Sequence, residues 1–204
     1  MVKLLSSCPA LETLELLCFR GFHRLEITSP NLKRLILDGG GGYDSFEIVA
    51  PHLQHLEISG DRGYLKRRLV NVSSLVTASL TFSIICITVD DESYIGEEEY
   101  DVEEDNCPDY HQAFRNLVLH YLEKLSHVTQ LKIGSWLAEV VFMLQLEGVA
   151  LPELRCKCLT LEMPITKNTL YGVASLLWTS LLLETLNIHL GVGIHMLLIS
   201  PAIS

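Results

Sequence analysis

One eight-residue phrase, P-x-L-x-x-L-x-[IL], occurs three times near the start of the chain: residues 9–16 read PALETLEL, residues 30–37 read PNLKRLIL and residues 51–58 read PHLQHLEI. Its leading leucines, Leu11, Leu32 and Leu53, are 21 residues apart. A fixed period of about 20 to 29 residues is typical of solenoids built from stacked coils. The sequence therefore predicts a repeat protein in which each phrase begins a new coil.

The spacing of apolar residues within a coil predicts two short strands. Leu14 and Leu16 of the first phrase are two residues apart, so they point to the same side of a strand. A second apolar pair recurs with the same 21-residue offset: Leu25 with Ile27, then Phe46 with Ile48. One coil offers too few apolar side chains to fold alone, so the coils must stack. The predicted fold class is α/β: a leucine-rich repeat solenoid with short parallel strands on the concave face, convex strands in the first half and helices in the second.

The second half of the chain repeats the phrase less regularly. A weaker fourth copy covers residues 72–80, and the β-branched run at 81–89 predicts a buried strand. Apolar residues at steps of three and four predict a helix from Tyr110 to Leu125, and further helices are predicted at 136–146 and 171–181. The strand phrase returns near residues 128–133, 154–161 and 183–188. We divide the chain into regular repeats (1–89), an acidic disordered insertion (90–107), repeats with convex helices (108–190) and an atypical tail (191–204).

The charge of the chain is unevenly distributed. The formal net charge is −10, from 15 basic and 25 acidic residues. Ten of the acidic residues lie between Asp90 and Asp105, where no Lys or Arg occurs, so the rest is balanced. This balance argues against a nucleic-acid partner, which needs a basic face. The acidic insertion is either a docking site for a basic partner or a tolerated loop.

The six cysteines have no disulfide-framework spacing, and we expect buried free thiols. No apolar run reaches 18 residues, so no membrane span is predicted. With no signal peptide, a cytoplasmic or nuclear location is expected.

We find no motif for catalysis, a cofactor or a metal, and the chain is predicted not to be an enzyme. The eight histidines are scattered, and the glycine run at 39–42 lacks the Lys-Ser/Thr ending of a phosphate-binding loop. Cys156 and Cys158 would place both thiols on one strand face, but zinc needs two more ligands. No G-x-S-x-G sequence is present.

The best candidate functional residues are those that alternate with the core leucines in the predicted concave strands. Strand alternation turns them away from the core, toward a bound protein. Their mixed charge suggests a specific patch. These partner-binding candidates are Thr13, Glu15, Arg34, Ile36, His55, Glu57, Gln130, Lys132, Thr185 and Asn187.

Four stretches together carry a family resemblance: LLSSCPALETL at residues 4–14, SPNLKRL at 29–35, APHLQHLEISG at 50–60 and VASLLWTSLLLETL at 173–186. The chain resembles the leucine-rich repeat region of plant F-box/LRR proteins of the FBD type over about residues 1 to 190. The resemblance implies a protein–protein interaction module like the repeats that bind the substrate of an SCF-type E3 ubiquitin ligase. In such proteins the F-box binds a Skp1-type adaptor and the repeats bind the target.

The two ends of the chain differ from that pattern. The first phrase begins at Pro9, ahead of which an F-box does not fit, so binding to a Skp1-type adaptor is not expected. The FBD segment is not recognisable at the C-terminus. An alternative hypothesis is a truncated or orphan repeat fragment with no independent ligase function.

Overall fold

The computed structural model describes residues 8–18, 23–39, 46–60, 67–82, 110–164 and 166–189. The predicted acidic insertion at 90–107 and the predicted tail at 191–204 lie outside them.

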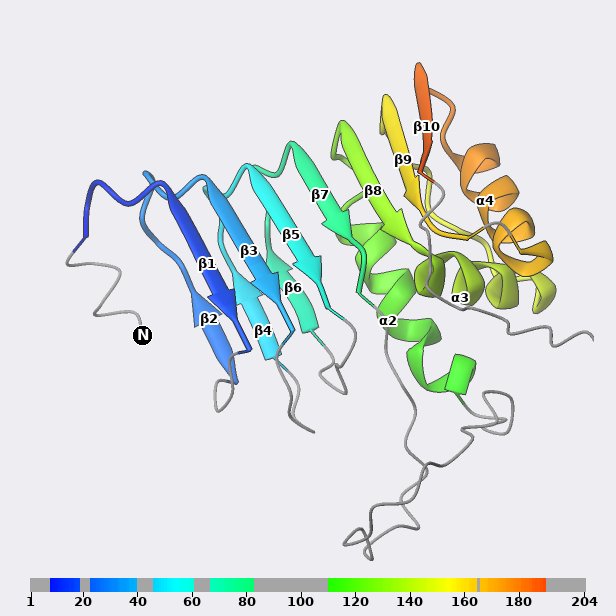
Figure 1. Ribbon diagram of the computed structural model, residues 1–204, viewed down its shortest axis with the longest axis horizontal. Coiled ribbons are helices and arrows are strands. Elements are labelled where there is room, and N and C mark those ends of the chain that lie inside the picture. Colours follow the sequence, from blue (N-terminus) through cyan, green and yellow to red (C-terminus); the bar gives the residue numbers. More distant parts are fainter. Residues whose placement is uncertain are drawn as a thin grey trace, which may run out of the picture.

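A large parallel sheet runs along the whole described chain (Figure 1). Its seven strands, in spatial order, are β1 (Thr13–Leu17), β3 (Arg34–Asp38), β5 (His55–Ser59), β7 (Thr77–Leu80), β8 (Gln130–Gly134), β9 (Cys158–Glu162) and β10 (Thr185–His189). Spatial order follows chain order, as stacked coils require. The predicted fold class, a leucine-rich repeat solenoid of the α/β class, is confirmed.

The register of this sheet follows the repeat phrase. Leu14 of β1 is aligned with Leu35 of β3, which is aligned with Leu56 of β5. The same inward position continues as Ala78, Leu131, Leu159 and Leu186. From β3 to β9 these residues are at most 3 % exposed. From β3 to β9 the aligned residues therefore form one continuous core row, which is partly exposed at Leu14 and 41 % exposed at Leu186.

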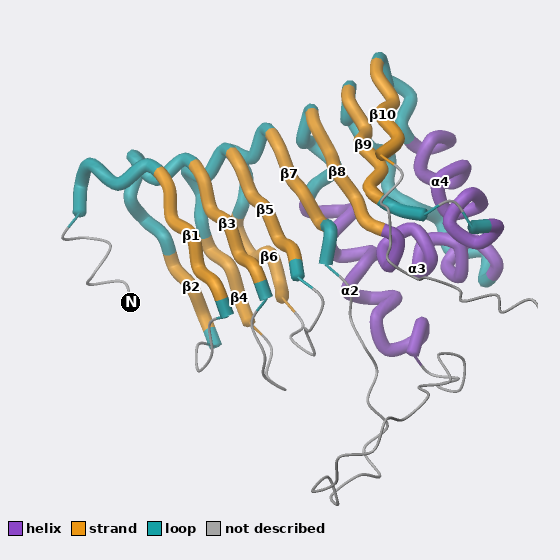
Figure 2. Tube along the Cα trace, viewed as in Figure 1, coloured by secondary structure: helices purple, strands orange, loops and turns teal. Residues whose placement is uncertain are grey.

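A second layer lies behind the large sheet, and along the solenoid it changes from strands to helices (Figure 2). It begins with a small parallel sheet of β2 (Arg24–Glu26), β4 (Phe46–Val49) and β6 (Arg67–Asn71). It continues with α2 (Tyr110–Lys124), α3 (Ser135–Leu146) and α4 (Lys167–Thr179). The change from convex strands to convex helices was predicted. β6 was not predicted, because it has a single buried apolar residue, Leu69, and its pairing with β4 contains a register shift.

Helix α2 packs against β6 at the point where the layer changes. The His120 side chain places Nε2 3.0 Å from the Leu69 carbonyl oxygen, so an imidazole hydrogen bond covers the backbone of β6. Burial lowers the pKa of His120 below its ordinary 6.5, an effect that the hydrogen bond to Leu69 partly opposes and the nearby Arg68 and Lys124 charges reinforce. An aromatic cluster of Phe82, Phe114, Tyr121 and Trp136 fills the space between α2, α3 and the end of β7.

Helices α3 and α4 pack very closely. Gly172 of α4 is buried, and a Cβ atom there would lie 1.9 Å from the carbonyl oxygen of Ala138 in α3. The start of α4 is fixed by a capping box in which Thr166 and Thr169 exchange side-chain hydrogen bonds with each other's backbone N–H.

The coils enter their strands in the same way, and the first three strands of the large sheet also end in the same way. The carbonyl of Glu12 accepts N–H bonds from both Lys33 and Arg34, at 2.8 and 3.0 Å. The same double acceptance recurs at the strand starts of the later coils, through the carbonyls of Lys33, Gln54, Val76, Thr129 and Lys157. A left-handed backbone conformation follows the first three strands, at Cys18 (φ 47°), Gly39 (φ 64°) and Gly60 (φ 102°).

The prediction of a buried strand at residues 81–89 receives no support. β7 ends at Leu80, and Thr81 and Phe82 follow it as loop, with Phe82 buried in the aromatic cluster. Residues 83–89 lie outside the described chain.

Candidate functional site

The large sheet has one face packed on the second layer and one face turned away from it, which we call the open face. Strand alternation places two rows of side chains on the open face, aligned across all seven strands. The first row contains Thr13, Arg34, His55, Thr77, Gln130, Cys158 and Thr185. The second row contains Glu15, Ile36, Glu57, Ser79, Lys132, Thr160 and Asn187.

All ten partner-binding candidates lie in these two rows, and none is buried. The structure brings five of them together around one hollow: Arg34, His55, Glu57, Gln130 and Lys132. The other five lie outside the hollow: Thr13, Glu15, Ile36, Thr185 and Asn187. That these side chains contact a partner stays a prediction.

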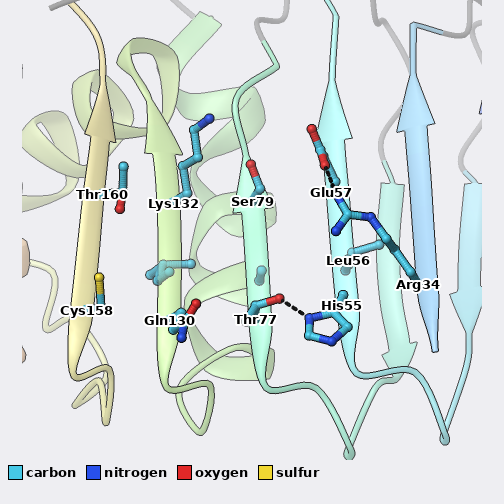
Figure 3. A pocket seen from close by; sticks show the side chains of 12 residues that line it. Arg34, His55, Leu56, Glu57, Thr77, Ser79, Gln130, Lys132, Cys158 and Thr160 are labelled. Carbon is cyan, nitrogen blue, oxygen red and sulfur yellow. Dashed lines mark hydrogen bonds and ion pairs between the residues drawn. The ribbon is translucent and has the colours of Figure 1, made fainter. Parts of the chain in front are cut away.

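The hollow has a volume of about 250 Å³ and lies over β7, as Figure 3 shows. It forms there because β7 carries small side chains, Thr77 and Ser79, between longer ones on β5 and β8. Cys158 and Thr160 of β9 close its far side. These four residues were missed from the sequence, because the phrases at residues 72–80 and 154–161 are weak or irregular copies. Extending the register of the first three phrases to residues 72–80 and 154–161 is the signal that could have found them.

One side of the hollow is formed by side chains that are already hydrogen bonded. Arg34 and Glu57 form an ion pair, with Nη2 3.1 Å from Oε2. His55 Nδ1 lies 2.7 Å from the Thr77 hydroxyl oxygen. These contacts join side chains of β3, β5 and β7 along this side of the hollow.

The opposite side combines one charge with several neutral groups. Lys132 of β8 forms an ion pair with Glu162 of β9. The Asn187 amide donates to Cys158 Sγ at 3.4 Å and to Thr160 Oγ1 at 3.3 Å. Exposed ion pairs contribute only about 0 to 1 kcal/mol to folding. These charges are therefore nearly neutral for stability, and a partner can rearrange them at small cost.

The thiols are not arranged as the sequence suggested. Cys158 is the first residue of β9 and lies on the open face, whereas Cys156 precedes the strand and is 1 % exposed. Strand alternation therefore does not apply to this pair, and the prediction that both thiols lie on one strand face is wrong. Burial raises the pKa of the Cys156 thiol, which lies 3.6 Å from the Ser180 hydroxyl. The expectation of buried thiols is also wrong for Cys8 and Cys18, which are exposed.

The side chains around the hollow are hydrogen-bond donors and acceptors and paired charges. His55 and Thr77 resemble a base and a hydroxyl nucleophile, but among the described residues no third group orients the other imidazole nitrogen. No group of three or more His, Cys, Asp or Glu side chains in the described ranges is placed to hold a metal ion. None of the helices there has the length and apolarity that crossing a membrane requires.

The aligned leucine core, the parallel sheet and the helical second layer define a leucine-rich repeat protein. The chain is 31 % identical over 121 residues to an F-box/LRR-repeat protein of Arabidopsis thaliana, which covers 59 % of this chain and 22 % of the relative. A second Arabidopsis thaliana protein, named as a putative F-box/LRR-repeat protein, is 28 % identical over 112 residues, which covers 54 % of this chain and 24 % of the relative. The resemblance to plant F-box/LRR proteins is confirmed, and these names support a protein-interaction repeat module.

The aligned region spans about a quarter of the length of each of these relatives. The chain matches no protein-family model and no solved structure.

Proposed function

We propose that this chain binds a target protein through the open face of its large sheet, as the substrate-binding repeats of an SCF-type F-box protein do. One observation carries the proposal. Two rows of non-buried, mostly polar side chains are held in register across seven strands, and they surround a shallow hollow.

The dimensions of the open face suit a protein. Seven strands spaced about 4.8 Å apart give a platform roughly 29 Å wide. A stable protein interface covers about 800 Å² of each partner, and a platform of this width with two side-chain rows can supply much of that area. A small molecule would instead need a deeper, more enclosed site.

The proposed role is non-enzymatic. The groups around the hollow donate and accept hydrogen bonds and pair charges, which is what specific recognition requires. Catalysis on the target, if it is ubiquitylated, belongs to other subunits of the ligase. The relatives are F-box/LRR-repeat proteins by name, and this supports the proposal at the level of the family.

Affinity capture from a plant extract tests the proposal with two matched variants. The open-face variant replaces Arg34, His55 and Gln130 with alanine. The control replaces Arg24, Glu26 and Glu47 with alanine, which removes an exposed ion-pair cluster from the small sheet. We expect a defined set of proteins to be captured by wild type and control, and to be depleted about fivefold or more with the open-face variant.

Two further readouts complete the experiment. A circular-dichroism melt shows whether each variant unfolds cooperatively; a wild-type chain with no transition would favour the orphan-fragment hypothesis. Capture that is equal for all three proteins would contradict the proposal. Recovery of a Skp1-type adaptor by this chain alone would show that it takes part in ligase assembly directly.

A further inference from the structure

Three neighbouring strands carry hydrogen-bond donors side by side, from β7 beneath the hollow to β9 at its far side. In the second row, Ser79 of β7 is aligned with Lys132 of β8, and Lys132 is aligned with Thr160 of β9. All three side chains line the hollow (Figure 3). We call them the donor row. Adjacent members are one strand spacing apart, about 4.8 Å, so a single small group can contact two of them at once.

The donor row has unused donor capacity. A lysine ammonium has three N–H donors, and the ion pair with Glu162 uses one of them. The Thr160 oxygen accepts from the Asn187 amide, so its own hydrogen is directed elsewhere. Among the described residues, no hydrogen bond engages the Ser79 hydroxyl. Within the described part of the chain, two N–H groups of Lys132 and the hydroxyl hydrogens of Ser79 and Thr160 are therefore available to a ligand.

The nearby carboxylates do not occupy this position. Glu57 is the neighbour of Ser79 in the same row, but Arg34 holds it from the other side at 3.1 Å. Glu162 is two residues beyond Thr160 on β9, near the end of the strand. Arg34 neutralises Glu57, whereas the cation paired with Glu162 is Lys132 itself, so an incoming acidic group competes with Glu162 for the ammonium.

We propose that the donor row, Ser79, Lys132 and Thr160, binds an acidic side chain of a target protein that crosses the hollow. An ammonium flanked by hydroxyl donors matches the several acceptor oxygens of a carboxylate or a phosphorylated hydroxyl. The inference rests on the proposed function, since it assigns the chemistry of the group that the open face recognises. Arg34 and Glu57 then flank the target segment, and Gln130 lies beside Lys132 with both a donor and an acceptor.

Peptide pools test this assignment with the purified full chain. Each pool contains peptides of about twelve residues, long enough in extended form to cross the sheet, with random flanks and a fixed central residue. The central residue is Asp, Glu, phosphoserine, Asn, Gln or Ser. Binding of the labelled chain to each immobilised pool is measured for wild type and for three variants: Lys132→Gln, Glu162→Gln and Lys157→Gln.

The variants separate the donor row from general electrostatics. Lys132→Gln removes the central positive charge, and Glu162→Gln frees that charge from its internal partner. Lys157→Gln is the matched control, because Lys157 forms a comparable exposed pair with Glu184 at 2.7 Å but does not line the hollow. We expect wild type to prefer acidic over amide pools by about fivefold to tenfold, as for a charge-assisted contact at a partly exposed site.

The expected pattern across variants is specific. Glu162→Gln strengthens the acidic preference, Lys132→Gln abolishes it, and Lys157→Gln leaves it unchanged. A preference confined to the phosphoserine pool would identify a phosphorylated target, and a preference shared with Asp and Glu would identify a carboxylate.

Three results would overturn the inference. Binding without acidic preference, or with a preference that survives Lys132→Gln, would refute the donor row while leaving the proposed protein-binding function intact. Absence of binding to every pool would also refute it, and the affinity-capture experiment would then decide the proposed function separately.

Discussion

Replacing Gly172 with alanine sets two opposing effects against each other. Alanine is the better residue inside a helix, by about 1 kcal/mol over glycine. The new Cβ, however, would lie 1.9 Å from the Ala138 carbonyl oxygen and 2.8 Å from its carbonyl carbon. These are backbone atoms of α3, so no side-chain rotation relieves the contact. Relief requires α4 to move away from α3.

The size of that movement sets the expected cost. To restore an ordinary contact of about 3.4 Å, α4 must shift by roughly 1.5 Å away from α3. A gap of about 0.5 to 1 Å between packed surfaces already loses about a quarter to a half of the dispersion energy of the facing atoms. Val173 and Leu176, the buried apolar side chains of α4, contribute about 1.5 to 3 kcal/mol each. Overpacking of this kind costs about 3 kcal/mol. After the gain in helix propensity, we expect Gly172→Ala to lower the free energy of unfolding by about 2 kcal/mol.

Urea denaturation, followed by circular dichroism, measures this change. The control is Ala174→Gly in the same helix, at an exposed position, where only helix propensity acts and a loss of about 1 kcal/mol is expected. The two variants exchange the same pair of residues in opposite directions, yet both should destabilise. A Gly172→Ala protein that is as stable as wild type, or more stable, would refute the close approach of α3 and α4.

Three further predictions concern single side chains. Cys18 adopts the left-handed conformation that Gly39 has in the next coil, so Cys18→Gly should raise the free energy of unfolding by about 0.5 to 1 kcal/mol, as read from the urea midpoint. His120 has a lowered pKa in the folded protein, so the unfolded chain binds the proton more readily and the free energy of unfolding should fall as the pH drops below about 6.5. His120→Gln should remove the share of this fall that is due to His120. Urea midpoints at pH 7.5 and pH 5 measure the difference. Cys156, buried and with a raised pKa, should be alkylated by iodoacetamide more slowly than Cys158 in peptide mass spectrometry, and equal rates would contradict its placement.

The sequence was sufficient to predict the elements whose apolar spacing is regular. The leucines of the first three phrases defined β1, β3 and β5, and the steps of three and four from Tyr110 defined α2. β6 was missed because its inward face offers only Leu69, and a strand signal needs at least two alternating apolar residues. Thr81 and Phe82 were assigned to a strand by β propensity, but Phe82 instead packs in the aromatic cluster, a tertiary effect that local propensity does not contain.

The sequence predicted which side chains lie on the open face, but it did not predict where on that face the hollow lies. Alternation with leucine correctly placed Arg34, Glu57 and Lys132 on the open face. The hollow depends on Thr77 and Ser79, whose importance lies in being smaller than their neighbours on adjacent strands. Such a size difference becomes visible only when the strands are aligned in space, since these neighbours are far apart in the sequence.

At the strand starts, a carbonyl that accepts two N–H bonds from the next coil fixes the register of neighbouring strands. This register depends little on the length of the coil between the strands. The Val76 carbonyl accepts from the N–H groups of Thr129 and Gln130 in the same way as the Glu12 carbonyl accepts from those of Lys33 and Arg34. Yet β7 and β8 are separated by far more sequence than β1 and β3. Closing a longer loop costs little, about 0.6 kcal/mol for each doubling of its length. The strand-to-strand bonds therefore keep the open face in register across a long connection as well as across a short one. By the same reasoning, repeats of this kind can diverge by insertion until period-based searches no longer detect them, while the register of the open face remains unchanged.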